Sequence, residues 1–329
     1  MDIKKKDMNI DVSIVIVCMN NLKNLYPCLE SIKKYTTVSY ETLVVAYLFS
    51  KENLEKVKKD FPWVTFIESN EIRGFSENNN LALRQAKGKY CFVLNDDTEM
   101  KMDVVGGLVK TIESLPENVA IVSPVTEFAN GDIQFCGRDI VNVKTIILDN
   151  LHLNSLFRKS IFIDRNGIFK SYNIIGAAFL IKTKVFENMG WFNEYYFFAP
   201  EDTALSSNLN HKGYECWVNS DVRITHFEGM TGKQRSGNIS LLQTATRPAG
   251  EKGLIYFLNG EKIGGIKYYL LCSWIYLISL LRFIYHIVRG LISNTKIYIV
   301  LAKGDLHILQ SLFSSMTPKE IFMKYNSKL

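Results

Sequence analysis

The residues able to do chemistry in this 329-residue sequence fall into three groups. The segment NDD at residues 95–97 follows an apolar run typical of a buried strand, Glu201 and Asp202 begin a helical stretch, and His226 ends a later strand-like run. Oxygen ligands with one imidazole suit Mg²⁺ or Mn²⁺, which usually join protein carboxylates to phosphates. A carboxylate at a helix N-terminus is stabilised in its ionised form, so Asp202 is a candidate general base.

Each of these signals is weak when it is taken alone. Adjacent acids are common on solvated turns, a single His after a strand is more often structural than a ligand, and acids often begin helices for reasons of charge. Their order along the chain favours the functional interpretation. A metal–diphosphate site with a separate carboxylate is the outline of a glycosyl transfer, in which the metal stabilises the leaving diphosphate and the carboxylate takes a proton from the attacking hydroxyl.

The elements that must position these residues alternate between strand and helix over the first 120 residues. The continuous β-branched run VSIVIVCMN predicts a central parallel strand, and the repeated alternation of strands and helices predicts a parallel sheet with helices on both faces. Ligands of such sheets bind beyond the carboxyl ends of the strands, so residues 20–21 and 96–97 are expected to meet there. The expected strands cover residues 12–20, 40–49, 63–69, 90–97 and 119–128, and the expected helices cover residues 25–35, 52–61 and 76–88, the last closed by Gly88.

Composition and charge narrow the class of protein. Apolar residues make up 47% of the chain, enough for a sizeable core, and the net charge is +6. The positive residues are spread out and do not alternate with stacking aromatics, which argues against a nucleic-acid partner and fits an anionic small molecule or membrane surface. Six cysteines occur singly, which indicates buried reduced thiols and a cytoplasmic location. The run VSIVIV near the N-terminus is a strand rather than a secretory signal.

The later part of the chain has a looser pattern. Few elements are expected between about residues 128 and 172, and a strand with a short helix resumes over residues 173–190. Residues 229–252 are rich in Gly, Ser, Thr and Arg and are expected to form a loop, whose Lys233, Arg235 and Arg247 are candidates to close over phosphates.

The last eighty residues are apolar and aromatic. The uninterrupted apolar stretch of residues 268–281 is short for a bilayer span, while Arg282, His286 and Arg289 recur at helical spacing. This pattern suits a helix lying in a membrane interface, peripheral to the inner face of the cell membrane. A hairpin packed on the domain or in a homo-dimer is the open alternative.

From about Val12 to Gly229 the sequence resembles the inverting glycosyltransferases of family 2, which have the GT-A fold, and especially their bacterial rhamnosyltransferase-like branch. The resemblance is carried by VSIVIVCMNN, ETLVVA, RGFSENNNLALRQAKGKYCFVLNDDT, IIGAAFLIKTKVFENMGWFNEYYFFAPEDTALS and GYECWVNSDVRITHFEG. It implies an α/β fold with a doubly wound, mainly parallel, Rossmann-like sheet. A GT-A domain would cover residues 1–252, with a nucleotide-sugar half up to about residue 120, and residues 253–329 would form a helical apolar extension.

The resemblance also assigns roles to the candidate metal and catalytic residues. Asn95 and Asp97 fill the outer positions of the family's N-x-D motif, with Asp97 the main contact to Mn²⁺ or Mg²⁺, and His226 matches a late metal ligand. Asp202 matches the catalytic base, and Glu201 is its neighbour at the acceptor.

The remaining residues that match the family are expected to lie near the nucleotide-sugar donor. The residues that the resemblance and the strand ends place near the nucleotide sugar are Asn20, Asn21, Tyr47, Gly74, Phe75, Asn79, Asn80, Asn95, Asp96, Gly176 and Ala177. The implied partners are a nucleotide-diphosphate sugar and a saccharide or lipid-linked acceptor, in the synthesis of surface polysaccharide.

Three positions depart from the family pattern. Ala46 stands where the second strand usually ends in Asp, Ala204 replaces a third acid, and Asn208 replaces an Arg. These changes leave open a degenerate member that binds a glycan or a protein partner without turnover. A nucleotidyltransferase is disfavoured, because no Gly-rich basic segment follows the first strand.

Overall fold

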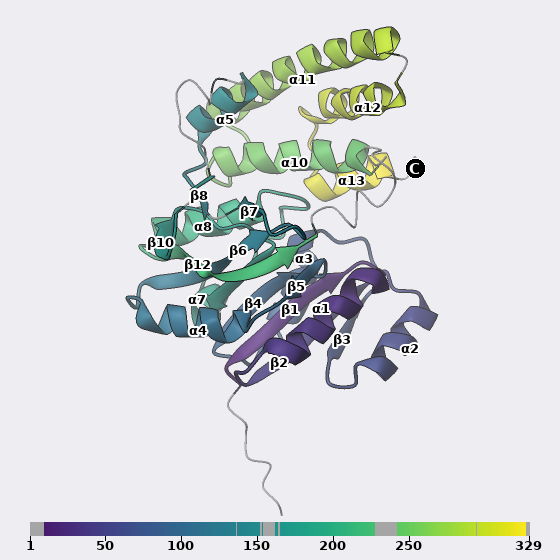
Figure 1. The fold of residues 1–329 in the computed structure, drawn as a ribbon. Helices are drawn as coiled ribbons and strands as arrows, with labels where there is room; N and C mark the ends of the chain where they lie inside the picture. Colours follow the sequence, from purple (N-terminus) through teal and green to yellow (C-terminus); the bar gives the residue numbers. More distant parts are fainter. Residues whose placement is uncertain are drawn as a thin grey trace, which may run out of the picture.

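The computed structural model describes residues 10–135, 137–151, 153, 162–163, 165–227, 242–293 and 295–326. Figure 1 shows a central sheet covered by helices on both faces, with a layer of C-terminal helices lying over one end of it.

The sheet is mixed and mostly parallel, as the sequence predicts. Its strand order is β10-β12-β6-β11-β4-β1-β2-β3, with β5 paired to β12 and β7 to β6, while β8 and β9 form a separate pair. The parallel neighbours are β1 with β2 and β4, β2 with β3, and β6 with β12, whereas β11 runs antiparallel between β4 and β6. The strands are β1 (Val12–Cys18), β2 (Tyr40–Tyr47), β3 (Thr65–Ser69), β4 (Tyr90–Asn95), β5 (Thr98–Met100), β6 (Val119–Glu127), β7 (Ile133–Phe135), β8 (Gly137–Arg138), β9 (Phe162–Ile163), β10 (Ile168–Ser171), β11 (Ala178–Lys182) and β12 (Glu215–His226).

Two hydrophobic cores lie on the two faces of the sheet. Alternate residues of β1 point to opposite faces, so Ile14 and Ile16 pack with α1, α2 and α4, while Val15 packs with α3, α7 and α8. The helices are α1 (Leu22–Tyr35), α2 (Lys51–Asp60), α3 (Phe75–Leu83), α4 (Val104–Ser114), α5 (Val143–Asn150), α7 (Thr183–Asn188) and α8 (Glu201–His211). The five described cysteines are buried and free, as expected, and Cys136 lies outside the described residues.

Two local expectations are wrong. Gly88 does not cap α3, which ends at Leu83; its backbone N–H instead donates to the Ser13 hydroxyl at 2.9 Å, where the chain passes close to β1. The loop expected over residues 229–252 is wrong in its second half, because Gln243–Leu258 forms helix α10. Lys233 and Arg235 lie outside the described residues, and Arg247 lies on α10.

The C-terminal layer consists of α10 and three further helices, α11 (Ile266–Ser293), α12 (Lys296–Ser311) and α13 (Pro318–Asn326). α11 and α12 form a hairpin that packs on α10, and Ile255, Cys272, Ile275 and Ile308 lie in its core. Among the described residues, α11 is the one helix long and apolar enough to cross a membrane by length and composition, and 28% of its apolar window is buried.

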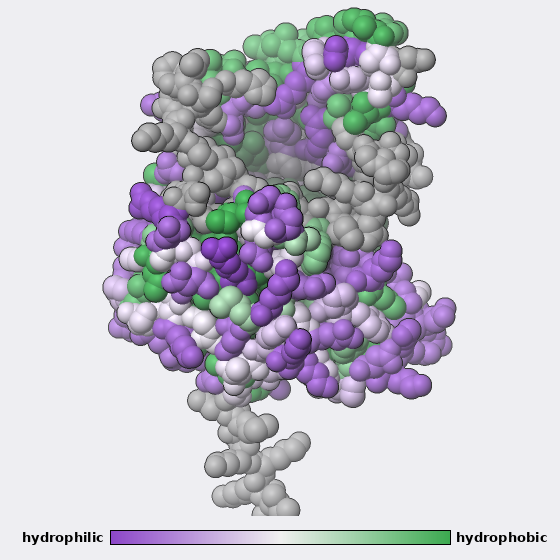
Figure 2. Space-filling model, viewed as in Figure 1, coloured by the Kyte–Doolittle hydropathy of each residue, from purple (hydrophilic) through white to green (hydrophobic). Residues whose placement is uncertain are grey.

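Two of the three basic residues predicted on α11, Arg282 and His286, face the protein, whereas the third, Arg289, is exposed. Arg282 donates to Asn150 at 3.0 Å, and His286 lies 2.6 Å from the carboxylate of the fully buried Asp305. Arg247 of α10 bonds the same carboxylate at 2.7 Å. The outer face of α11 is mainly apolar, and it forms the hydrophobic upper surface in Figure 2.

Candidate active site

The carboxyl ends of β4 and β12 bring two of the predicted metal ligands together. β5 follows β4 directly and pairs antiparallel with β12, with Thr98 opposite His226. The backbone N–H of Phe227 donates to the Asp97 carbonyl at 2.9 Å, which fixes the turn against the end of β12. As a result, Nε2 of His226 lies 3.3 Å from Oδ1 of Asp97, and both side chains are about nine-tenths buried.

Gln134 determines how the His226 ring is presented. Its Nε2 donates to the backbone carbonyl of His226 at 2.6 Å, so its Oε1 faces Nδ1 of the ring at 3.0 Å as an acceptor. A neutral ring then carries its proton on Nδ1, and the Nε2 lone pair faces the Asp97 carboxylate. In this tautomer two acceptors face each other, and either a bound cation or a proton on Nε2 satisfies both of them. This donor set therefore fits a divalent cation such as Mn²⁺.

Asp96 lies beside this pair but points into the protein. Burial raises the pKa of its carboxyl to about 7, and the nearby charge of Asp97 adds to the shift, while interactions with Cys18 and Asn24 lower it. One carboxyl oxygen, Oδ2, is buried and has no hydrogen-bond partner in the described residues.

The second acidic pair begins α8 after Pro200. Oδ2 of Asp202 accepts from the backbone N–H of Gly176 at 3.0 Å, and Oδ1 accepts from the N–H of Thr203 at 2.6 Å. Burial and the neighbouring Asp202 charge raise the pKa of Glu201 well above its ordinary value, and its Oε2 has no partner among the described residues. The pair thus combines a carboxylate held by backbone donors with a carboxyl group that favours its neutral form.

Gly176 and Ala177 connect the two acidic sites. The backbone N–H of Asn95 donates to the Ala177 carbonyl at 2.9 Å, and the next residue back, Gly176, donates to Asp202. A short segment before β11 therefore joins the end of the metal-binding strand to the start of α8.

A cavity of about 250 Å³ opens beside Asp202. Its lining includes Arg138, Asp149, Thr145 and Leu254 as well as the acidic pair. Nη1 of Arg138 lies 3.9 Å from Oδ2 of Asp202, so the wall of the cavity places a guanidinium group near this carboxylate.

Of the residues predicted at the ends of β1 and β2, Asn20 is exposed, while Asn21 and Tyr47 are half-buried. Asn20 has a positive φ of 49°, and its side-chain oxygen accepts from the N–H of Ser50 and from Asn53. Asn21 precedes α1 and makes no side-chain cap. The Tyr47 hydroxyl accepts from the backbone N–H of Arg73 at 3.3 Å, which ties the end of β2 to the segment leading into α3.

The predicted donor residues of α3 are involved in internal packing. A Cβ at Gly74 would lie 2.4 Å from the Phe197 carbonyl oxygen, so glycine allows this close approach of two backbones. The Phe75 ring contacts Phe192. The Asn79 amide donates to the Phe75 carbonyl at 2.9 Å, and the fully buried Asn80 bonds Phe192 and Glu194. Both amides are therefore held by hydrogen bonds within the protein.

Two functional candidates were missed in the sequence. Gln134 and Arg138 both lie in the polar region between residues 128 and 172, on strands of three and two residues. Strands this short give no periodicity, so no signal in the sequence marked either side chain.

Comparisons with solved structures agree with the fold. A structure of GalNAc-T7 with UDP, GalNAc and Mn²⁺ matches with a TM-score of 0.52 at 16% identity, over 67% of this chain and 44% of that one. This chain thus spans less than half the length of that protein. A mannosyltransferase, PcManGT from Pyrobaculum calidifontis, in complex with GDP-Man and Mn²⁺, matches with a TM-score of 0.52 at 14% identity, over 92% of this chain and 88% of that one.

Comparison of the sequence itself gives a family. No curated protein matches the chain significantly. The family model described as glycosyl transferase family 2 matches residues 13–190, more than half of the sequence and the part that contains β1 to β4 and the Asp97 turn. The chain belongs to glycosyl transferase family 2.

Proposed function

We propose that the protein transfers a sugar from a nucleotide-diphosphate donor to a hydroxyl of a saccharide or lipid-linked acceptor, with inversion at the anomeric carbon. The observation that carries the proposal is the convergence of the Asp97–His226 pair and Asp202 on one end of the sheet. Family membership and the two neighbours solved with UDP or GDP-Man and Mn²⁺ support it. A role in surface polysaccharide synthesis is part of the proposal, and rhamnose is one candidate sugar.

Asp97 and His226 are the residues that would hold the cation, and Asn95 at the end of β4 is the third candidate. A bound Mn²⁺ or Mg²⁺ would neutralise the charge that develops on the leaving diphosphate. Gln134 keeps the His226 ring in the tautomer whose Nε2 is available as a ligand. Asp96 is less suited to the cation, because its carboxyl is buried beside Cys18 and burial raises its pKa to about 7.

Asp202 would act as the general base. Its position at the start of α8 and its bonds from Gly176 and Thr203 stabilise the carboxylate and orient it. Proton transfer from the acceptor hydroxyl to this carboxylate accompanies formation of the new glycosidic bond, and the bond from the anomeric carbon to the diphosphate breaks. Glu201, in its neutral form, would donate a hydrogen bond to the acceptor.

A donor screen tests the proposal. Purified protein with Mn²⁺ is mixed with UDP-, dTDP- and GDP-sugars, and release of nucleoside diphosphate is followed with and without a set of saccharide acceptors. Metal-dependent release from one donor is expected, and NMR of the product would show an inverted anomeric centre. Metal-dependent nucleotide binding without any release, with every acceptor tested, would contradict turnover and would favour a degenerate binding protein.

We also propose that the protein lies on the inner face of the cell membrane through α11. Its outer face exposes residues at helical spacing, and at least 47% of each of these side chains is accessible: Ile266, Leu270, Leu277, Leu281, Ile284, Val288 and Ile292. Burying a Leu or Ile of this kind contributes about 1–2 kcal/mol, so the stripe as a whole favours an apolar surface. Because Arg282 and His286 bond α5 and α12 on the inner face, an in-plane position is favoured over a span.

Vesicle flotation tests the membrane contact. Wild-type protein should float with anionic vesicles, and Leu281→Glu with Ile284→Glu should abolish flotation. Phe128→Glu is the matched control, because Phe128 is an exposed aromatic on the sheet domain. Absence of flotation, together with a dimer in light scattering that the double variant converts to a monomer, would show instead that α11 is a dimer interface.

A further inference from the structure

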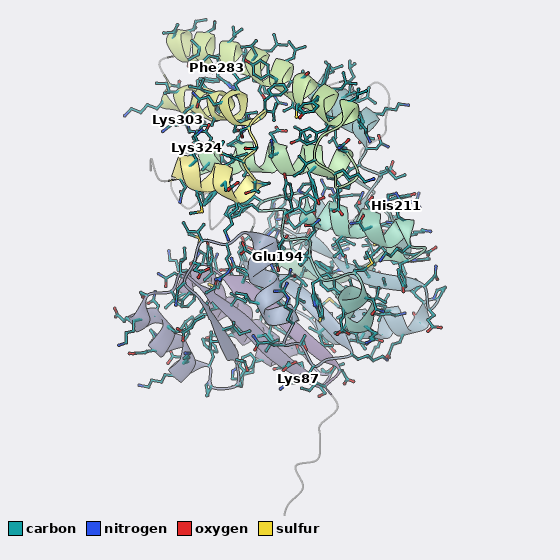
Figure 3. All side chains as sticks on the ribbon, turned by 180° about the vertical axis from the view of Figure 1, so that it is seen from behind. Lys87, Glu194, His211, Phe283, Lys303 and Lys324 are labelled. Atoms are coloured by element: carbon teal, nitrogen blue, oxygen red, sulfur yellow. The ribbon has the colours of Figure 1, made fainter. Side chains whose placement is uncertain are left out.

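One face of α8 leads away from the catalytic pair. Glu201, Ala204, Asn208 and His211 follow one another at spacings of three and four residues, so they form a single stripe along the helix. The stripe spans about 15 Å, because each helical residue rises 1.5 Å. His211 ends it, between the sheet domain and the C-terminal helices, as Figure 3 shows.

Three adjoining cavities follow this stripe. The cavity beside Asp202 shares Ile140 and Val141 with a cavity of about 460 Å³ at the other end of α8. A third cavity, of about 270 Å³, shares Glu201 with the first and Asn208 with the second. The shared lining residues place the three cavities side by side along α8, and we call them together the groove, which begins at the proposed base.

The far end of the groove offers side chains suited to sugars. Within the described part of the chain, Ser207, Asn208, His211 and Lys267 have no side-chain hydrogen bonds, and all four line the 460 Å³ cavity. Tyr172, which is 42% exposed, adds an aromatic surface. An amide and hydroxyls that both donate and accept, placed beside an aromatic ring, match the alternation of hydroxyl groups and C–H faces on a saccharide.

The opposite wall of the groove is a constrained turn. Glu261 lines both the 460 Å³ and the 270 Å³ cavities and has a positive φ of 57°. Its carboxylate accepts from the Tyr196 hydroxyl at 2.8 Å, which holds the turn between α10 and α11 against the sheet domain. Non-glycine residues in this conformation are often retained at binding sites.

We propose that this groove binds the sugar units of the acceptor that lie behind the attacking hydroxyl. The acceptor is then a saccharide chain of two or more units rather than a single sugar. This inference rests on the proposed function, because it takes Asp202 as the point where the acceptor hydroxyl is placed. Among the described residues, the lining of the far cavity has mixed charge and includes no arginine, so a sugar is favoured over a phosphate as its occupant.

A glycan array tests the groove without requiring turnover. Labelled protein is applied to an array of bacterial mono- and oligosaccharides, and the best ligand is then measured by NMR titration. Wild type should prefer an oligosaccharide to its terminal monosaccharide. Tyr172→Ala and Asn208→Leu should each weaken binding by about tenfold. Lys212→Ala, at an exposed residue that lines none of the three cavities, is the matched control and should bind as wild type does.

The outcomes separate this inference from the proposed function. Asp97→Ala should keep glycan binding, because the groove does not include the metal pair. A folded wild type that binds a donor nucleotide but no glycan, or binding that survives both groove variants, would overturn the groove and leave the transferase proposal standing. If the wild type binds a glycan, the groove variants do not, and no donor nucleotide is bound, the groove inference is supported and the transferase proposal is refuted.

Discussion

The variant Asp202→Asn distinguishes a role of Asp202 in accepting a proton from a role in holding the local backbone. The amide keeps one oxygen that can accept from Gly176 or Thr203, so at most one of the two backbone bonds at 3.0 and 2.6 Å is lost. The loss of one such bond costs about 1 kcal/mol of stability. The proton acceptor itself disappears, and removal of a general base slows a reaction by about 10²–10⁴-fold, or about 3–5 kcal/mol in the activation free energy.

The assay is steady-state transfer with the donor identified in the screen, together with calorimetric donor binding. We expect kcat for Asp202→Asn to fall by at least about 10²-fold, with donor affinity within about twofold of wild type. Glu201→Gln is the matched control, because its amide can still donate a hydrogen bond, and it should lose less than about tenfold. Equal losses in the two variants, or a kcat for Asp202→Asn close to wild type, would refute the role of Asp202 as the base.

Three further predictions concern stability, and all are measured by urea unfolding. Gly74→Ala should destabilise the fold by about 2 kcal/mol, because the new Cβ meets the Phe197 backbone at 2.4 Å, whereas Gly176→Ala, whose nearest contact is 3.4 Å, should cost under about 1 kcal/mol. Asp305→Asn should cost about 2–3 kcal/mol, because it leaves the charge of Arg247 without its buried partner, and a change under about 0.5 kcal/mol would contradict this. The pKa of Glu201 is raised in the folded protein, so above the ordinary pKa of 4.5 the unfolded chain releases a proton that the folded protein keeps. The folded state of the wild type therefore loses stability as the pH rises from 4.5 through the raised pKa of Glu201. Glu201→Gln should therefore gain stability relative to wild type between pH 5 and pH 9, and a difference that does not change with pH would show that this carboxyl is not perturbed.

The sheet and the metal pair follow from patterns that are strong in the sequence. Apolar runs predict β1, β2 and β4, with β-branched residues most frequent in β1, and the parallel order then brings the polar residues after β4 to one end of the sheet. The proximity of Asp97 and His226 depends further on β5, which is only three residues long but pairs with the end of β12.

Other parts of the site could not be read from the sequence, because they depend on contacts between distant residues. Asn79 and Asn80 are polar and would ordinarily face solvent, but in the structure they bond backbone carbonyl groups in the interior. The spacing of the basic residues of α11 predicts a helix, but it does not indicate whether these residues point toward the protein or toward its surroundings. Arg282 and His286 point inward because Asn150 and Asp305, 132 and 19 residues away, supply their partners.

Binding of nucleoside diphosphate with and without Mn²⁺ tests the central proposal most directly. Calorimetry should show that wild type binds UDP, dTDP or GDP in the presence of Mn²⁺, and at least about tenfold more weakly once the metal is removed. Asp97→Asn should bind as weakly with Mn²⁺ as without it, while Asp221→Asn, a change at an exposed acid on β12, should match wild type. Nucleotide binding that depends on Mn²⁺ to the same degree in Asp97→Asn as in wild type would contradict the metal site at the end of β4.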